Sequence, residues 1–212
     1  MSAVPDASWV LFIAASLLLI ATPGQDMILV MSRSIAHGAS AGVATAAGVS
    51  VGLVGHTALA TLGLGAVLRT SEWLFVVLKV VGAAYLVYLG IQLLRSRAHP
   101  LELSAGAARS PARLFVDGAL SNLSNPKIAI FYFAFLPQFV SPDAVHPARS
   151  LFVLGLVFAG LTFVVKAPVG LSAALLSARL RARPAALAWL YRTSGAVLIG
   201  LGVRLAFERR GG

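Results

Sequence analysis

The hydrophobic positions of this chain gather into six long apolar runs separated by short polar connections. The approximate limits of the runs are 8–31, 41–68, 73–94, 114–140, 150–176 and 187–207. Each run is long enough to cross a hydrocarbon core, which takes about 20 helical residues. Backbone polar groups cannot stay unpaired in lipid, and the runs lack the alternation of a barrel strand. The pattern therefore predicts an all-α, polytopic membrane protein with six transmembrane helices.

The composition supports this prediction. Hydrophobic residues make up 58% of the 212 residues, and charged residues make up 11%, less than half the roughly 25% of a soluble domain. The formal net charge of +10 could suggest nucleic-acid binding, but the arginines sit in short clusters between the apolar runs. We therefore expect the chain to lie in the lipid bilayer and not to bind nucleic acid.

The Lys and Arg residues of the short connections predict the orientation, because cytoplasmic loops carry the excess of cations. One side receives nine: Arg33, Arg95, Arg97, Arg109, Arg113, Arg179, Arg181, Arg183 and Arg192. The other side receives five: Arg69, Arg149, Arg204, Arg209 and Arg210. Lys79, Lys127 and Lys166 fall inside predicted spans. The nine-cation side is predicted to be cytoplasmic, which places both termini outside.

The longest connection, residues 96–113, is rich in Ala, Ser, Arg and Pro and divides the chain into two sets of three spans, 1–95 and 114–212. We interpret it as a cytoplasmic linker. Because three is odd, the two halves must cross the membrane in opposite directions, as in inverted-repeat transporters. Two internal echoes favour this arrangement. Lys79-Val-Val-Gly-Ala in the third span matches Arg192-Thr-Ser-Gly-Ala in the sixth, and Thr22-Pro23-Gly24 in the first matches Asn125-Pro126-Lys127 in the fourth.

The two matched prolines predict breaks in the first and fourth helices. Proline removes a backbone donor and clashes with the preceding turn, so Pro23 with Gly24, and Pro126, should open their helices near mid-membrane. The freed backbone groups must then find partners in protein, water or a solute. Polar residues flank both breaks. We predict a solute site formed by Thr22, Pro23, Gly24, Asp26, Asn122, Asn125, Pro126 and Lys127.

Asp26 and Lys127 are the charged members of this predicted site. A carboxylate within an apolar segment is costly unless it is paired, protonated or wetted, so Asp26 is a functional candidate. Lys127 could pair with Asp26 permanently or could receive a substrate carboxylate. Asn122 and Asn125 could bind the opened backbone, a ligand or a neighbouring helix.

Further polar residues lie in other spans. His56 ends a stripe with Gly48 and Gly52 that should pack closely against a neighbouring helix, and it is a candidate, with Asp26, for proton coupling. Lys166 is a further candidate for a gate or ion pair, and the Ala167-Pro168 that follows it is predicted to break the fifth span. Trp9, Trp73, Trp189 and Tyr191 lie near span ends and are assigned to the aromatic belt of a membrane helix.

The chain resembles the lysine exporter (LysE/RhtB-type) family over almost its whole length. The segments that carry the resemblance are Ala21-Thr-Pro-Gly-Gln-Asp-Met-Ile-Leu-Val30; Ser32-Arg33-Ser34 with Gly38 and Gly42; Lys79 to Gly90; and Asn125-Pro-Lys127 followed by Pro137-Gln138-Phe139. The resemblance implies a six-helix, proton-driven exporter of amino acids or close derivatives in a bacterial inner membrane, and it adds Gln138 as a candidate site residue. The chain departs from the family at Gln25, where a second proline usually follows Thr-Pro-Gly.

These observations predict a secondary transporter with an amino acid as substrate, without catalytic residues, bound metal or cofactor. An amino acid suits the predicted site because Asp26 and Lys127 could bind its two charged groups. One alternative is an exporter of metal or inorganic ions, for which the spans offer few ligands. Another is an intramembrane enzyme, although the spans contain no nucleophile-base pair, paired carboxylates or zinc motif. Glycine-rich faces serve packing within one chain or between two, which leaves a homo-oligomer open.

Overall fold

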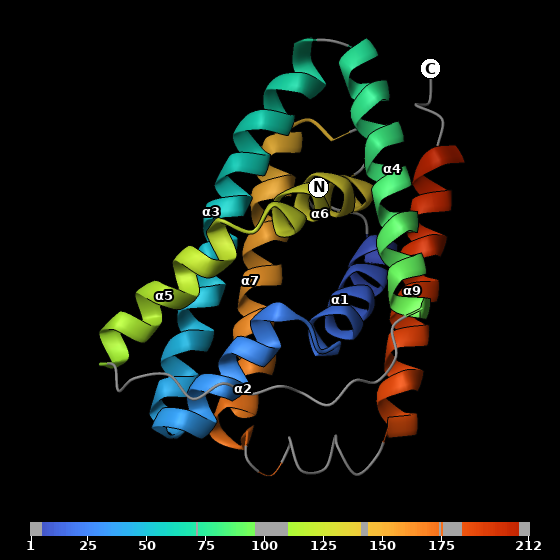
Figure 1. Ribbon diagram of the computed structural model, residues 1–212. Coiled ribbons are helices and arrows are strands. Elements are labelled where there is room, and N and C mark those ends of the chain that lie inside the picture. Colours follow the sequence, from blue (N-terminus) through green and yellow to red (C-terminus); the bar gives the residue numbers. More distant parts are fainter. Residues whose placement is uncertain are drawn as a thin grey trace.

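The computed structural model describes residues 6–70, 72–95, 110–140, 144–173, 175 and 184–207. The described residues form eight α-helices and one short 3-10 helix, and they contain no strand. Figure 1 shows them as one bundle of long, steep helices crossed by shorter ones. The predicted all-α fold is confirmed.

The first predicted span is a broken helix. It consists of α1 (Asp6–Ala21) and α2 (Gln25–His37), and the two axes differ by 51°. Thr22 and Pro23 separate them, and Gly24 has an extended backbone as the N-cap of α2. The break predicted at Pro23 is therefore present.

The fourth predicted span is broken in the same way. It consists of α5 (Pro111–Leu123) and α6 (Pro126–Phe135), followed by the 3-10 helix η1 (Leu136–Phe139). Pro126 occupies the first turn of α6, where the missing N–H costs nothing, and the Asn125 side chain caps that helix. The break predicted at Pro126 is confirmed.

Four longer helices complete the bundle: α3 (Ala39–Thr70), α4 (Glu72–Arg95), α7 (Pro147–Leu171) and α9 (Pro184–Phe207). By length and hydropathy, two segments of the described chain could cross a membrane, Ala39–Gly63 and Pro147–Leu171, and the bent α1–α2 pair could be a third. The α5–α6 pair is divided into helices of 13 and 10 residues. Six spans therefore stay a prediction.

Two predicted boundaries differ in the structure. Pro168 does not break the fifth span, because α7 continues through it to Leu171. A proline in a membrane helix costs one backbone hydrogen bond, which a packed helix can lose without separating. The predicted linker 96–113 lies outside the described residues except for 110–113, and Pro111 already begins α5.

Close glycine contacts fix how the long helices pack. A Cβ added at Gly42 would lie 2.8 Å from the Cα of Gly170, and one added at Gly155 would collide with Thr57. From the first pair to the second, the residue number rises along α3 and falls along α7, so the two helices are antiparallel. Figure 1 shows α3 rising and α7 descending.

The same argument applies to α4 and α9. A Cβ at Gly90 would lie 2.6 Å from the carbonyl oxygen of Gly195, and a Cβ at Gly202 would lie 2.8 Å from that of Ala83. These two helices are therefore antiparallel as well (Figure 1).

The predicted Gly48–Gly52 stripe packs against α5. A Cβ at Gly52 would lie 2.8 Å from both the Ala119 carbonyl oxygen and the Asn122 side chain, and a Cβ at Gly48 would collide with the carbonyl of Phe115. Small residues thus let two backbones approach closely, as expected for membrane helices. The predicted close packing of this face is confirmed, and it occurs within one chain.

The core and the outer surface are both apolar. Aromatic rings fill the centre, where Phe135 stacks on Phe131 with centroids 4.8 Å apart and also contacts Phe12 and Phe158. Large apolar side chains also face outward, including Leu62, Val164 and Phe207. Exposed apolar surface on this scale fits lipid rather than water.

Candidate functional site

The two helix breaks border a cavity of about 340 Å³. Its polar lining consists of Thr22, Gln25, Asp26, Gln92, Asn125, Lys127, Tyr132, Thr162 and Lys166, and Pro23 and Gly24 of the first break also line it. Its apolar lining includes Leu53 from α3, Leu89 and Leu93 from α4, Phe131 from α6, Phe158 from α7 and Leu198 from α9. The cavity therefore has groups for a polar ligand and an apolar wall for a hydrocarbon side chain.

Asp26 is the acid of this cavity. It lies in the first turn of α2 and is 8% exposed. Its Oδ2 accepts a hydrogen bond from Asn122 Nδ2 at 2.9 Å and lies 3.3 Å from the ammonium of Lys166. Its Oδ1 is buried and has no hydrogen-bond partner among the described residues. The first helix break thus places a buried, ion-paired carboxylate in the wall of the cavity.

Lys166 is the cation that pairs with Asp26. It comes from α7 and is 6% exposed. Since Asp26 belongs to the first half of the chain and Lys166 to the second, the pair joins the two halves. Of the two roles considered for Lys127, pairing with Asp26 is not the one seen here, because α7 packs against α2 and brings Lys166 to the carboxylate instead. Lys166, a lower-ranked candidate in the sequence, is a central member of the site.

Asn122 and His56 support Asp26 from behind. Asn122 is fully buried and bonds Asp26 across the two breaks. His56 Nε2 donates to the Asn122 backbone oxygen at 3.0 Å, and the His56 ring lies 5.9 Å from that of Tyr132. Neither Asn122 nor His56 lines the cavity. Of the roles considered for Asn122, the structure shows a link between helices.

Asn125 and Gln25 join the two breaks directly. Asn125 Oδ1 accepts from the Lys127 backbone N–H at 3.0 Å, and Asn125 Nδ2 donates to Gln25 Oε1 at 3.2 Å. Sequence reasoning noted Gln25 only as a departure from the family pattern. Nothing in a single sequence indicates that Gln25 bonds a residue 100 positions away.

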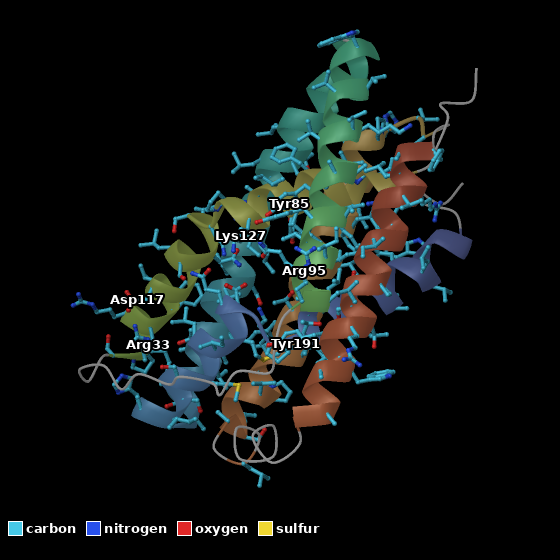
Figure 2. The ribbon with its side chains drawn as sticks, turned by 45° about the vertical axis from the view of Figure 1, so that its right-hand side comes forward. Arg33, Tyr85, Arg95, Asp117, Lys127 and Tyr191 are labelled. Atoms are coloured by element: carbon cyan, nitrogen blue, oxygen red, sulfur yellow. The ribbon has the colours of Figure 1, made fainter. Side chains whose placement is uncertain are left out.

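Lys127 lies on the exposed side of the cavity. Its side chain is exposed, and no described residue bonds its ammonium group. Its backbone oxygen accepts from Tyr85 Oη at 3.3 Å, and Figure 2 shows Tyr85 of α4 beside Lys127. The Asp26–Lys166 pair is neutral, so Lys127 adds one positive charge to the lining.

The carbonyl group at the first break has a partner in α9. Tyr191 Oη donates to the Pro23 oxygen at 3.2 Å, and Thr22 Oγ1 donates to the Leu18 oxygen at 2.9 Å. The sequence assigned Tyr191 to an aromatic belt and so missed this contact. A phenol near a span end serves either role, and only the packing of α9 against α1 selects this one.

The structure thus brings seven predicted residues around one cavity: Thr22, Pro23, Gly24, Asp26, Asn125, Lys127 and Lys166. Two other candidates lie apart from the lining. Pro126 begins α6, and the buried Gln138 donates from Nε2 to the Ala134 oxygen at 3.0 Å. Within the described part of the chain, no three His, Cys, Asp or Glu residues gather as metal ligands.

Comparison with known proteins identifies the family of this chain. The model of the LysE type translocator family matches residues 17–209. The homoserine/homoserine lactone efflux protein of Salmonella typhimurium (strain LT2) is 36% identical over 205 residues, which cover 95% of this chain and 97% of that protein. The leucine efflux protein of Klebsiella pneumoniae is 28% identical over 200 residues, which cover 94% of each chain. No solved structure matches the chain. The chain therefore belongs to the LysE type translocator family, and it is a transporter rather than an enzyme.

Proposed function

We propose that this protein exports amino acids or close derivatives across a bacterial inner membrane, through the cavity between its two helix breaks, in exchange for protons. The observation that carries the proposal is the buried carboxylate of Asp26, which lines a partly apolar cavity and pairs there with Lys166. Relatives that are named as homoserine, homoserine lactone and leucine efflux proteins support the substrate class.

A zwitterion matches the charges of the cavity. The substrate ammonium would bind the carboxylate of Asp26, the one acid in the described lining. The substrate carboxylate would bind the ammonium of Lys127, at the N-terminus of α6 where the helix dipole also favours an anion. Leu89, Phe131 and Phe158 would surround an apolar side chain.

Two inverted three-helix repeats would give this cavity access to both sides in turn. The antiparallel packing of α3 with α7, and of α4 with α9, supports opposite orientations of residues 1–95 and 114–212. The cavity lies between the halves, since Asp26 and Leu89 belong to the first and Lys127 and Lys166 to the second. Rocking of one half against the other would open it to each side.

Proton coupling requires a group of the cavity to change protonation during the cycle. Of the two candidates taken from the sequence, Asp26 lines the cavity, so it can take part directly, either as the proton carrier or as the counter-ion of the group that carries the proton. His56 is bonded to the Asn122 backbone and does not line the cavity. It would therefore act on the cavity only through Asn122.

Transport in proteoliposomes tests the proposal. With an imposed proton gradient, we expect accumulation of at least one of L-homoserine, L-homoserine lactone, L-leucine and L-lysine. No accumulation of any would refute the exporter proposal. Asp26→Asn should abolish accumulation, whereas the same exchange at Asp117, which does not line the cavity and lies apart from Lys127 in Figure 2, should preserve it. Normal accumulation by Asp26→Asn would remove that residue from the mechanism.

The orientation has its own test, because the chain contains no cysteine. Ala112 near the start of α5 and Val145 before α7 are both exposed. We expect a cysteine at Ala112 to react only with reagent from the cytoplasmic side, and one at Val145 only with external reagent. The reverse labelling would overturn the proposed orientation.

A further inference from the structure

Lys166 occupies the position that a substrate ammonium would need. Its Nζ lies 3.3 Å from Asp26 Oδ2, and both side chains line the cavity. Asp26 is the one acid in the described lining, so two ammonium groups would compete for the same carboxylate whenever an amino acid enters.

We propose that Lys166 is the proton-carrying residue of the transport cycle, and that it pairs with Asp26 in the empty carrier as an internal substitute for the substrate ammonium. This proposal rests on the proposed function and assigns its coupling step. In it Asp26 stays ionised throughout, and Lys166 gains and loses the proton.

The surroundings of Lys166 explain why it would release a proton. The ionisable groups around the cavity are Asp26 from α2, Lys127 and Tyr132 from α6, and, more distant, His56 from α3 and Tyr191 from α9. None but Asp26 is an anion. Lys166 is 6% exposed, so an ammonium displaced from Asp26 would be poorly hydrated and would lack a counter-ion among the described residues of the lining. It would leave its proton with water in the open cavity and remain as a neutral amine.

The cycle balances in atoms and charge. On the cytoplasmic side, the substrate ammonium binds Asp26, and Lys166 changes from NH3+ to NH2 as one proton enters cytoplasmic water. The loaded carrier then opens outward and releases the zwitterion. Lys166 takes one proton from external water, pairs again with Asp26, and the empty carrier returns. One proton and one positive charge move inward for each zwitterion that moves outward.

Local backbone features support movement of Lys166. Pro168 lies inside α7 two residues further on, and it cannot donate the backbone hydrogen bond to residue 164. A helix that lacks one bond beside the pair can adjust more easily when the pair separates. Asn122 remains as a donor to Asp26 Oδ2 at 2.9 Å, so the carboxylate keeps its position after Lys166 leaves.

Two substitutions distinguish a proton carrier from a structural ion pair. Lys166→Arg keeps the charge, but the guanidinium does not release its proton. We expect it to lose both proton-driven accumulation and exchange of L-homoserine and L-leucine at equal concentrations. Lys166→Met cannot compete for Asp26 or carry a proton, so we expect exchange within about threefold of wild type and no accumulation. A structural pair gives the opposite order, with Arg tolerated and Met inactive, and that order would overturn the proposal.

Proton release gives a second readout that does not depend on the Met variant folding. Addition of L-homoserine or L-leucine to the purified wild-type protein in weakly buffered detergent should release about one proton for each molecule bound. Lys166→Arg should release none. Arg149→Gln, at the exposed start of the same helix and outside the cavity, should behave as wild type. Binding without proton release in the wild type would refute the role of Lys166 and leave the exporter proposal standing, whereas no binding or transport by the wild type would refute the exporter proposal itself.

Discussion

Gly52→Ala should separate α3 from α5 and disturb the acid of the cavity at the same time. The new Cβ would lie 2.8 Å from the Ala119 oxygen and 2.8 Å from both Cβ and Oδ1 of Asn122. Ordinary van der Waals contact begins at 3.4 Å, so these neighbours must move by about 0.6 Å. Two of the three obstacles belong to one side chain and the third to backbone, which leaves little room for a local adjustment.

The expected cost follows from this geometry. Overpacking a tightly packed interface destabilises by about 1–3 kcal/mol. A shift of about 0.6 Å along the bond would lengthen the 2.9 Å contact between Asn122 and Asp26 to about 3.5 Å, beyond a good hydrogen bond. Loss of a hydrogen bond to a charged group costs about 1.5–3 kcal/mol of folding stability, and transport should fall because Asn122 no longer holds the Asp26 carboxylate in position.

Thermal unfolding in detergent and transport in proteoliposomes measure both effects. Gly160→Ala in α7 is the matched control, because a Cβ added at Gly160 has no atom within 4 Å. Alanine should leave that variant unchanged or up to about 1 kcal/mol more stable. Gly52→Ala should unfold several degrees lower than Gly160→Ala, since 1 kcal/mol corresponds to about 2–4 °C at this size. Equal melting temperatures and equal transport in the two variants would refute the reasoning.

Two other predictions concern the polar lining. Lys127→Gln removes the ammonium that would bind the substrate carboxylate, a charge-assisted contact worth about 1.5–3 kcal/mol. KM for L-leucine should therefore rise roughly tenfold or more, with little change in the exchange rate at saturation. An unchanged KM would exclude Lys127 from substrate binding. Gln25→Leu removes the 3.2 Å bond to Asn125 that joins the two breaks, so the maximal exchange rate should change more than KM. A pure KM effect would instead make Gln25 a ligand of the substrate.

The helices could be predicted from the sequence because lipid permits few structures. The apolar runs had to be helical, and Pro23 and Pro126 had to interrupt them, since proline cannot donate a backbone bond. Both breaks are present. The prediction for Pro168 failed because a proline near a helix end can be accommodated when packing holds the helix together, and hydropathy carries no information about packing.

The site was only partly predictable for the same reason. Asp26 was identified because a carboxylate in an apolar span is costly wherever it points. Its partner was not, because position along a span does not give the direction of a side chain around the bundle. Lys127 and Lys166 are both cations inside apolar segments, and only the packing of α7 against α2 made Lys166 the partner.

The sequence by itself thus determined where helices form, where two of them break, and which charged residues lie among apolar ones, because these follow from the local chemistry of backbone and side chains in lipid. Tertiary structure alone decided which groups meet. The Gln25–Asn125 bond, the Tyr191–Pro23 bond and the Asp26–Lys166 pair each join residues at least 100 positions apart. Such contacts depend on the rotation and crossing of whole helices, which small residues at their interfaces set by the distance of closest approach.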